Sequence, residues 1–192
     1  MRRIVLTAFT AILMAAAASA QMPDSATQMK NWIDYMTPGK EHAMMASWNG
    51  NWTGDIQVWM APGAPPMTST GTCTNTMVLG GRYQQSSYTG SFMGQPFEGL
   101  STMAFDKAKK VFIFTWLDNM GTGVLYGTGR WNEATKSVTF VGRMVDASTY
   151  KEVPFREVFR VIDEDHQVME MYGPGPDGKE FRSMQINYTR RK

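Results

Sequence analysis

The residues best suited to chemistry lie in the C-terminal part of the sequence. There, charged side chains recur among apolar and aromatic ones at the two-residue spacing of β-strands. If the last three predicted strands pair through a tight turn at residues 164–165 and a longer second turn, Glu157 lies opposite Tyr172 and Glu170 lies opposite Arg182. The rest of that face is apolar or aromatic: Phe155, Phe159, Val161, Val168, Met184, Ile186 and Tyr188. A face of this composition is predicted to point into the protein interior.

The three charged residues on this face predict a binding site for a small, mostly apolar ligand with an acidic head group. A buried arginine holds a carboxylate through a bidentate pair of hydrogen bonds, so Arg182 is expected to anchor the ligand. Glu170 and Glu157 are expected to adjust the charge of that anchor. The predicted lining is aromatic or apolar: Phe159, Tyr172, Trp116 and Met184.

Two alternatives stay open for the same residues. The charges could form a salt bridge that fixes strand register in a filled, structural or partner-binding barrel, and a slip of one residue would turn all of them outward. Glu157 and Glu170 could instead be the acid–base pair of an enzyme acting on the ligand, which requires one of them to be inward, unpaired and shifted in pKa. The sequence carries no P-loop, G-x-S-x-G or H-E-x-x-H pattern, so an enzyme is the less favoured hypothesis and no catalytic residue is assigned.

No metal or cofactor site is predicted. Thioethers bind Cu(I), and 15 of the 17 methionines follow residue 20, with Met169 and Met171 on one strand face. However, no methionine array forms, and no histidine or cysteine is expected close enough to complete a site. The methionines are therefore expected to fill the core or to line a permissive pocket. Cys73 is the single cysteine, so no disulfide within the chain is possible.

The elements that must position these residues are β-strands. From residue 51 onward, turn signals recur every 8 to 13 residues and separate short alternating segments, which is typical of an all-β sandwich or barrel. About ten strands are predicted, near residues 52–60, 68–79, 82–91, 97–106, 110–117, 122–131, 136–145, 152–163, 166–173 and 179–190. Closing them into an antiparallel up-and-down barrel removes both sheet edges, and a barrel of this size tends to hold a cavity.

The N-terminal region is predicted to hold a signal peptide and a helical leader. Residues 1–20 combine a basic start, an apolar run too short to span a membrane comfortably, and an Ala-Ser-Ala cleavage pattern. Residues 21–46 show helical spacing, and residues 47–192 form the predicted barrel domain. The protein is therefore expected to be secreted, most simply to the periplasm. Without the peptide the chain has 17 basic and 17 acidic residues, so no charge pattern for nucleic acid or an anionic membrane remains.

The sequence also resembles known proteins. The stretch "SWNGNWTG" resembles the opening motif of lipocalin-like (calycin) barrels, which implies that Trp52 closes one barrel end and stacks on an arginine near the chain end, Arg190 or Arg191. A wider set of segments is similar to the bacterial domain-of-unknown-function 1579 family over about residues 40–192: "WMAPGAPPMTSTGT", "LGGRY", "GSFMGQPFEG", "WLDNMGTG" and "PDGKEFRSMQINYTRRK". This resemblance implies a lipocalin-like barrel and supplies no catalytic residues.

The segment Asp118-Asn119-Met120-Gly121 has two interpretations. Aspartate, asparagine and glycine are typical turn residues, and the simpler interpretation is a connection between two strands. The segment is longer than a two-residue hairpin needs, so a polar rim at a cavity mouth, with Met120 at its tip, is the alternative.

Overall fold

The structure is a computed structural model that describes residues 22–192. The predicted signal peptide, residues 1–20, lies outside the described residues. The chain divides into two compact units, and the second, Tyr35–Lys192, contains the barrel. In the first unit lies most of helix α1 (Ser25–Met36), which follows a cap in which Asp24 Oδ1 accepts a hydrogen bond from the Thr27 amide at 2.9 Å. None of the residues of α1 is buried.

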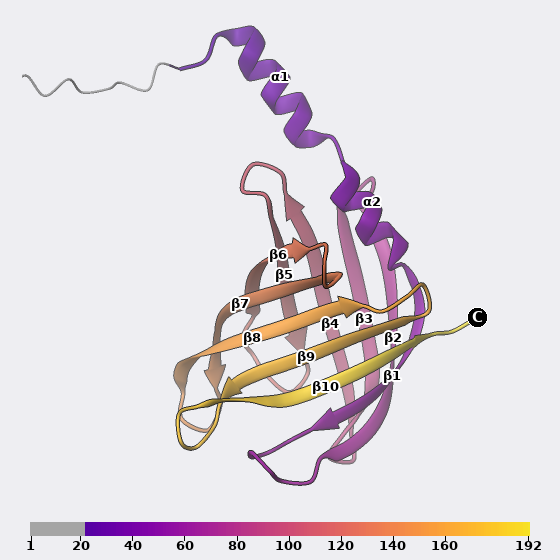
Figure 1. Ribbon diagram of the computed structural model, residues 1–192, viewed down its shortest axis with the longest axis vertical. Coiled ribbons are helices and arrows are strands. Elements are labelled where there is room, and N and C mark those ends of the chain that lie inside the picture. The colour runs from indigo at the N-terminus through magenta and orange to yellow at the C-terminus, as the bar shows by residue number, and fades with distance from the viewer. Residues whose placement is uncertain (1–21) are drawn as a thin grey trace, which may run out of the picture. The chain divides into compact units, whose positions relative to one another are not determined.

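Ten antiparallel strands follow one another around a closed barrel (Figure 1), which confirms the predicted fold. The strands are β1 (Gly50–Val58), β2 (Met67–Val78), β3 (Tyr83–Phe92), β4 (Gln95–Asp106), β5 (Val111–Asp118), β6 (Leu125–Asn132), β7 (Ser137–Asp146), β8 (Lys151–Val161), β9 (His166–Pro174) and β10 (Glu180–Arg190). Each pairs with its neighbours in sequence, and β1 pairs with β10 to close the ring. Closure leaves every strand paired on both sides.

Trp52 and Arg190 meet where the barrel closes. They are cross-strand partners of β1 and β10, and the Arg190 guanidinium lies 4.2 Å from the centroid of the Trp52 ring. Arg190 Nε donates to the Glu164 carbonyl at 2.9 Å, and its Nη2 donates to the Ser47 carbonyl at 3.2 Å. The Trp52 side chain is only 1% exposed, so the arginine covers a buried ring.

Helix α2 (Lys40–Ser47) closes the barrel end at which β1 begins. Met45 is fully buried, and Trp48, just after the helix, packs against Phe159 with ring centroids 5.0 Å apart. Gln84 Nε2 from β3 donates to the Met45 carbonyl at 2.6 Å. The hydrogen bond satisfies the Met45 carbonyl near the helix end, and the apolar contacts hold the helix against the strands.

Inward side chains form two separate apolar clusters. One lies under α2 and on β5, β7 and β8: Met45, Trp48, Phe112, Phe114, Val138, Phe140 and Phe155. The other lies on β1, β2 and β10: Trp52, Cys73, Ile186 and Tyr188. Most domains have one contiguous core. Two clusters on different walls therefore indicate that the middle of the barrel is not packed as a single core.

The predicted register of the last three strands is wrong, by one residue between β8 and β9 and by two to three residues between β9 and β10. Glu157 pairs with Met171 instead of Tyr172, because the β8–β9 connection is one residue longer at its base than a tight two-residue turn. Arg182 pairs with Tyr172 instead of Glu170, and the register then shifts between Arg182 and Met184. Because side chains alternate along a strand, the one-residue offset between β8 and β9 exchanges the inner and outer faces of β9.

Candidate functional site

Glu157 is the acidic side chain at the centre of the barrel interior. It lies in the middle of β8 between Phe155 and Phe159, which share its face. Its cross-strand partners are Phe140 on β7 and Met171 on β9, and both belong to the inner apolar packing. The alternation of β8 thus places one carboxyl group among aromatic rings and a thioether.

Burial away from water raises the pKa of Glu157 from 4.5 to about 8, with no contribution from a charged neighbour. At pH 7 the carboxyl is therefore mostly protonated and neutral, and it can donate a hydrogen bond as well as accept one. The side chain nevertheless keeps some accessible surface. Because the ring of strands around it is closed, that surface faces the barrel interior.

Two tyrosines come toward Glu157 from the other side of the barrel. The rings of Tyr88 on β3 and Tyr188 on β10 lie 6.5 Å apart. Burial raises the pKa of both phenols well above 10, with smaller contributions that include the carboxylate form of Glu157. Cys73, the cross-strand partner of Tyr88, has its pKa raised by burial to about 12, and its thiol donates to Asn75 Oδ1 at 3.0 Å. We call these four residues (Glu157, Tyr88, Tyr188 and Cys73) the lumen cluster.

The lumen cluster is surrounded by thioethers and aromatic rings. Trp116 on β5 packs against Tyr88 with ring centroids 4.9 Å apart, and Phe97 stacks on Trp116 at 6.2 Å. Six inward methionines pack against the two apolar clusters: Met77, Met103, Met144, Met169, Met171 and Met184. Polarizable, flexible thioethers adapt to ligands of varied shape.

Several inward side chains keep accessible surface although strands enclose them. Tyr88, Trp116, Met171, Met184 and Glu157 are all only partly buried. Side chains at the α2 end, by contrast, are almost completely buried. The accessible surface therefore lies toward the barrel centre and the opposite end.

The segment that follows β5 lies at that opposite end, since Phe112, the second residue of β5, belongs to the cluster under α2 and the strand runs away from it. Asp118 Oδ2 accepts a hydrogen bond from Trp116 Nε1 at 2.7 Å, and its Oδ1 accepts one from the Met120 amide at 2.9 Å. Asn119 Oδ1 accepts from the Glu98 amide at 3.0 Å, so the segment extends the β4–β5 pairing. Met120 is 49% exposed. The segment is both an ordered connection and part of the rim that supports Trp116.

Glu170, Tyr172 and Arg182 lie on the outer face, so the prediction that they line an interior site with Arg182 as its anchor is wrong. Glu170 Oε1 accepts a hydrogen bond from Arg182 Nη1 at 2.8 Å, and Arg160 lies 3.8 Å from its other oxygen. Arg156 covers the Tyr172 ring at 3.7 Å. These charges form an outer network, and the predicted acid–base pair is divided between the two faces of the sheet.

Four of the predicted lining and site residues share the inner face: Glu157, Phe159, Trp116 and Met184. Tyr88 and Tyr188 were not singled out as binding residues. The alternation of β3 and β10 indicates which face each tyrosine occupies. That both lie near Glu157 follows only from closure of the barrel.

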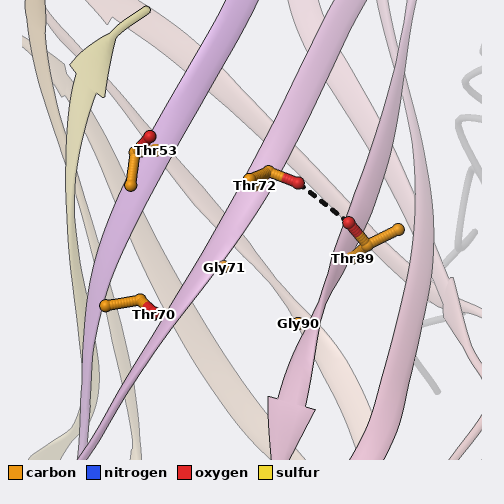
Figure 2. A pocket seen from close by; sticks show the side chains of 6 residues that line it. All are labelled: Thr53, Thr70, Gly71, Thr72, Thr89 and Gly90. Carbon is orange, nitrogen blue, oxygen red and sulfur yellow. Dashed lines mark hydrogen bonds between the residues drawn. The ribbon is translucent and has the colours of Figure 1, made fainter.

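Two hollows lie on the outside of the sheet. One, of about 400 Å³, runs over β1 to β3 and is lined by outward threonines and the backbone at Gly71 and Gly90 (Figure 2). The Thr72 and Thr89 hydroxyls there hydrogen-bond at 2.8 Å. The other, of about 650 Å³, borders β6 and β7 near Trp131 and Glu133. The first has no charged lining and neither contacts the lumen cluster, so the inner face remains the candidate site.

Within residues 22–192, no three acidic, histidine or cysteine side chains come together in an arrangement that could hold a metal ion. Over the same range, no helix is both long and apolar enough to cross a lipid bilayer.

Comparison with known proteins addresses the fold and the family. No curated protein matches the sequence. Among solved structures, the crystal structure of Rv2717c from M. tuberculosis is similar with a TM-score of 0.62 and 11% sequence identity, over 81% of this chain and all of that one. At this identity the likeness concerns the barrel fold alone. The family model for proteins of unknown function named DUF1579 matches residues 37–190, which include α2 and all ten strands. The chain therefore belongs to the DUF1579 family.

Proposed function

We propose that the protein is a secreted, periplasmic carrier that binds a small, mostly apolar molecule inside its barrel. The observation that carries the proposal is the isolated carboxyl of Glu157, held among neutral polar groups, aromatic rings and thioethers on the inner face. Small-molecule sites are typically apolar with a few convergent polar groups, and a strongly shifted pKa is typical of such sites.

The division of the interior into two apolar clusters supports the same conclusion. A barrel that served only as a scaffold gains stability from one continuous, close-packed core. Here, inward groups such as Met171, Met184 and Trp116 keep accessible surface between or beside the clusters. Burying that surface against an apolar ligand contributes about 25 cal/mol per Å² to binding before the costs of association.

Periplasmic location is supported by the sequence of residues 1–20. A second candidate function, an enzyme acting on the bound molecule, is favoured by one observation. The pKa of Glu157, about 8, is close to the value that suits a general acid or base near neutral pH.

Native mass spectrometry of the protein purified from the periplasm without detergent tests the proposal, followed by titration with the neutral fluorescent probe N-phenylnaphthylamine. We expect a bound apolar molecule or saturable probe binding. Met144→Trp, which adds bulk on the inner face, should weaken probe binding. Val145→Trp is the matched control, because Val145 is the next residue and is 60% exposed on the outer face. This variant should bind the probe as the natural protein does. Equal binding by both variants would refute an interior site, and a bound molecule whose mass changes on incubation would favour the enzyme.

A further inference from the structure

We propose that the polar end of the ligand is a lipophilic cation, such as an alkylammonium group, which pairs with Glu157 in the lumen cluster. This inference rests on the proposed function and names the ligand class of the same site.

The balance of charge on the inner face favours a cationic ligand. Within the described chain, Glu157 is an inward carboxyl, and Asp118 is a second one at the rim beside Trp116. Arg190 also belongs to the closure of the barrel, but it lies at the α2 end, where it is already stacked on Trp52 and bonded to backbone carbonyls. An anionic ligand would meet carboxyl groups without a free counter-charge, whereas a cation supplies the charge that Glu157 lacks.

The groups around Glu157 also suit a cation with a hydrocarbon chain. Tyr88 and Tyr188, from two other walls of the barrel, both interact electrostatically with Glu157, and Trp116 packs edge-to-face against Tyr88 with ring centroids 4.9 Å apart. Aromatic rings near a carboxyl group can bind an ammonium ion through cation–π attraction. Met171, the cross-strand partner of Glu157, adds a soft apolar surface for the adjoining hydrocarbon.

The neighbours of Glu157 do not change their charge near neutral pH. The side chains that face it are Phe140 from β7, Met171 from β9, Tyr88 from β3 with Cys73 from β2, and Tyr188 from β10. The phenol and thiol pKa values are raised by burial, so these groups stay neutral from pH 6 to 9. Over this range the charge of the cluster is set by Glu157 alone.

Binding of a cation therefore takes a proton from Glu157. With a pKa of about 8, the free protein holds about 0.9 proton on this carboxyl at pH 7, and a fixed cation should release it. Affinity for the cation should rise as pH increases, by up to about tenfold per pH unit below 8, and then level off. A neutral ligand of the same length should show no such rise.

The experiment compares three probes of equal chain length: dodecyltrimethylammonium, dodecanol and dodecanoate. Each is titrated between pH 6 and 9 against protein loaded with N-phenylnaphthylamine, and proton release is measured by calorimetry in two buffers of different ionisation enthalpy. We expect the cation to bind at least tenfold more tightly than the alcohol at pH 9. Glu157→Gln should remove this preference and the pH dependence. Glu152→Gln, on the outer face of the same strand with a side chain 68% exposed, should leave both unchanged.

The outcomes separate the inference from the proposed function. If the alcohol or the carboxylate displaces the probe as well as the cation does at every pH, the preference for a cation is refuted. The proposal that the protein is a carrier of apolar molecules is then still supported. Binding of the cation without proton release at pH 7 also refutes pairing with Glu157, and this measurement needs no variant. If the purified protein carries no bound molecule and neither the fluorescent probe nor the cation binds, both the carrier and the cation are refuted.

Discussion

Replacing Glu157 by glutamine should stabilise the protein increasingly as pH rises. An acid whose pKa is raised by folding holds its proton more tightly in the folded state than in the unfolded one. Its contribution is therefore fully present below pH 4.5 and is lost as pH rises toward about 8. Glutamine has nearly the same shape and hydrogen-bonding capacity but cannot ionise. The unfolding free energy of the variant therefore does not fall through ionisation of residue 157 as pH rises.

The magnitude follows from the shift of the Glu157 pKa from 4.5 to about 8. Each pKa unit corresponds to about 1.4 kcal/mol, so ionisation costs up to about 5 kcal/mol of unfolding free energy by pH 9 and roughly 3 kcal/mol at pH 7. Water that reaches the carboxyl inside the barrel would lower both figures. The difference in stability between variant and natural protein should grow by about 1.4 kcal/mol per pH unit between pH 5 and 8.

The assay is urea unfolding followed by tryptophan fluorescence at pH 5, 6, 7, 8 and 9. Other titrating groups are common to both proteins, so they cancel in the difference. Glu152→Gln, exposed on the outer face of β8, is the control and should stay within about 0.5 kcal/mol of the natural protein at every pH. A Glu157→Gln difference that does not change with pH would show that the carboxyl is solvated or paired, and would refute the description of the lumen cluster.

Three further predictions concern the outer face, the barrel closure and the thiol. Arg182→Leu should leave probe binding unchanged and lower unfolding free energy by about 1 kcal/mol, because it removes the partner that Glu170 contacts at 2.8 Å; weakened probe binding would place the arginine at the site. Arg190→Met should lower the unfolding free energy in urea by about 2–3 kcal/mol, since it removes the cation over the Trp52 ring and hydrogen bonds to backbone carbonyls. A decrease of less than about 0.5 kcal/mol would contradict the role of Arg190 in barrel closure. Cys73, with a pKa of about 12, should react with a thiol reagent at pH 8 at least a hundredfold more slowly in the folded than in the unfolded protein, and comparable rates would contradict its burial.

The barrel could be predicted because its signals are local. Turn residues at regular intervals and alternating segments such as Val138-x-Phe140 mark each strand without reference to the others. The stacking of Arg190 on Trp52 was implied by a resemblance, and the structure places the two groups 4.2 Å apart.

The site could be predicted only in part because strand register depends on backbone details that the side-chain pattern does not encode. The connection after β8 carries one more residue than a tight turn, and the register shift next to Arg182 changes the pairing again. Each offset of one residue moves a whole strand face. The inward position of Glu157 was predicted correctly because it depends only on the alternation along β8. Glu170 and Arg182 lie on the outer face because they depend on the β8–β9 register and on the register shift next to Arg182.

Tyr88 could not be assigned to the site from sequence, since β3 and β8 are far apart along the chain and pair with different neighbours. Their approach follows from the curvature of a closed sheet, which depends on strand number and stagger together. Such contacts across a barrel carry no periodic signal in either strand.

The pairing of β1 with β10 has a consequence for how the chain reaches its native state. Arg190 donates a hydrogen bond to the carbonyl of Asn49, 141 residues earlier. The barrel therefore cannot close until the last strand has been synthesised and can pair with β1. Contacts of such long sequence separation make folding slow, and until closure both β1 and the growing edge expose unpaired backbone groups that invite aggregation. A chain that stopped before β10 would be an open sheet, so loss of a few C-terminal residues should be far more damaging to solubility than their small contribution to the surface suggests.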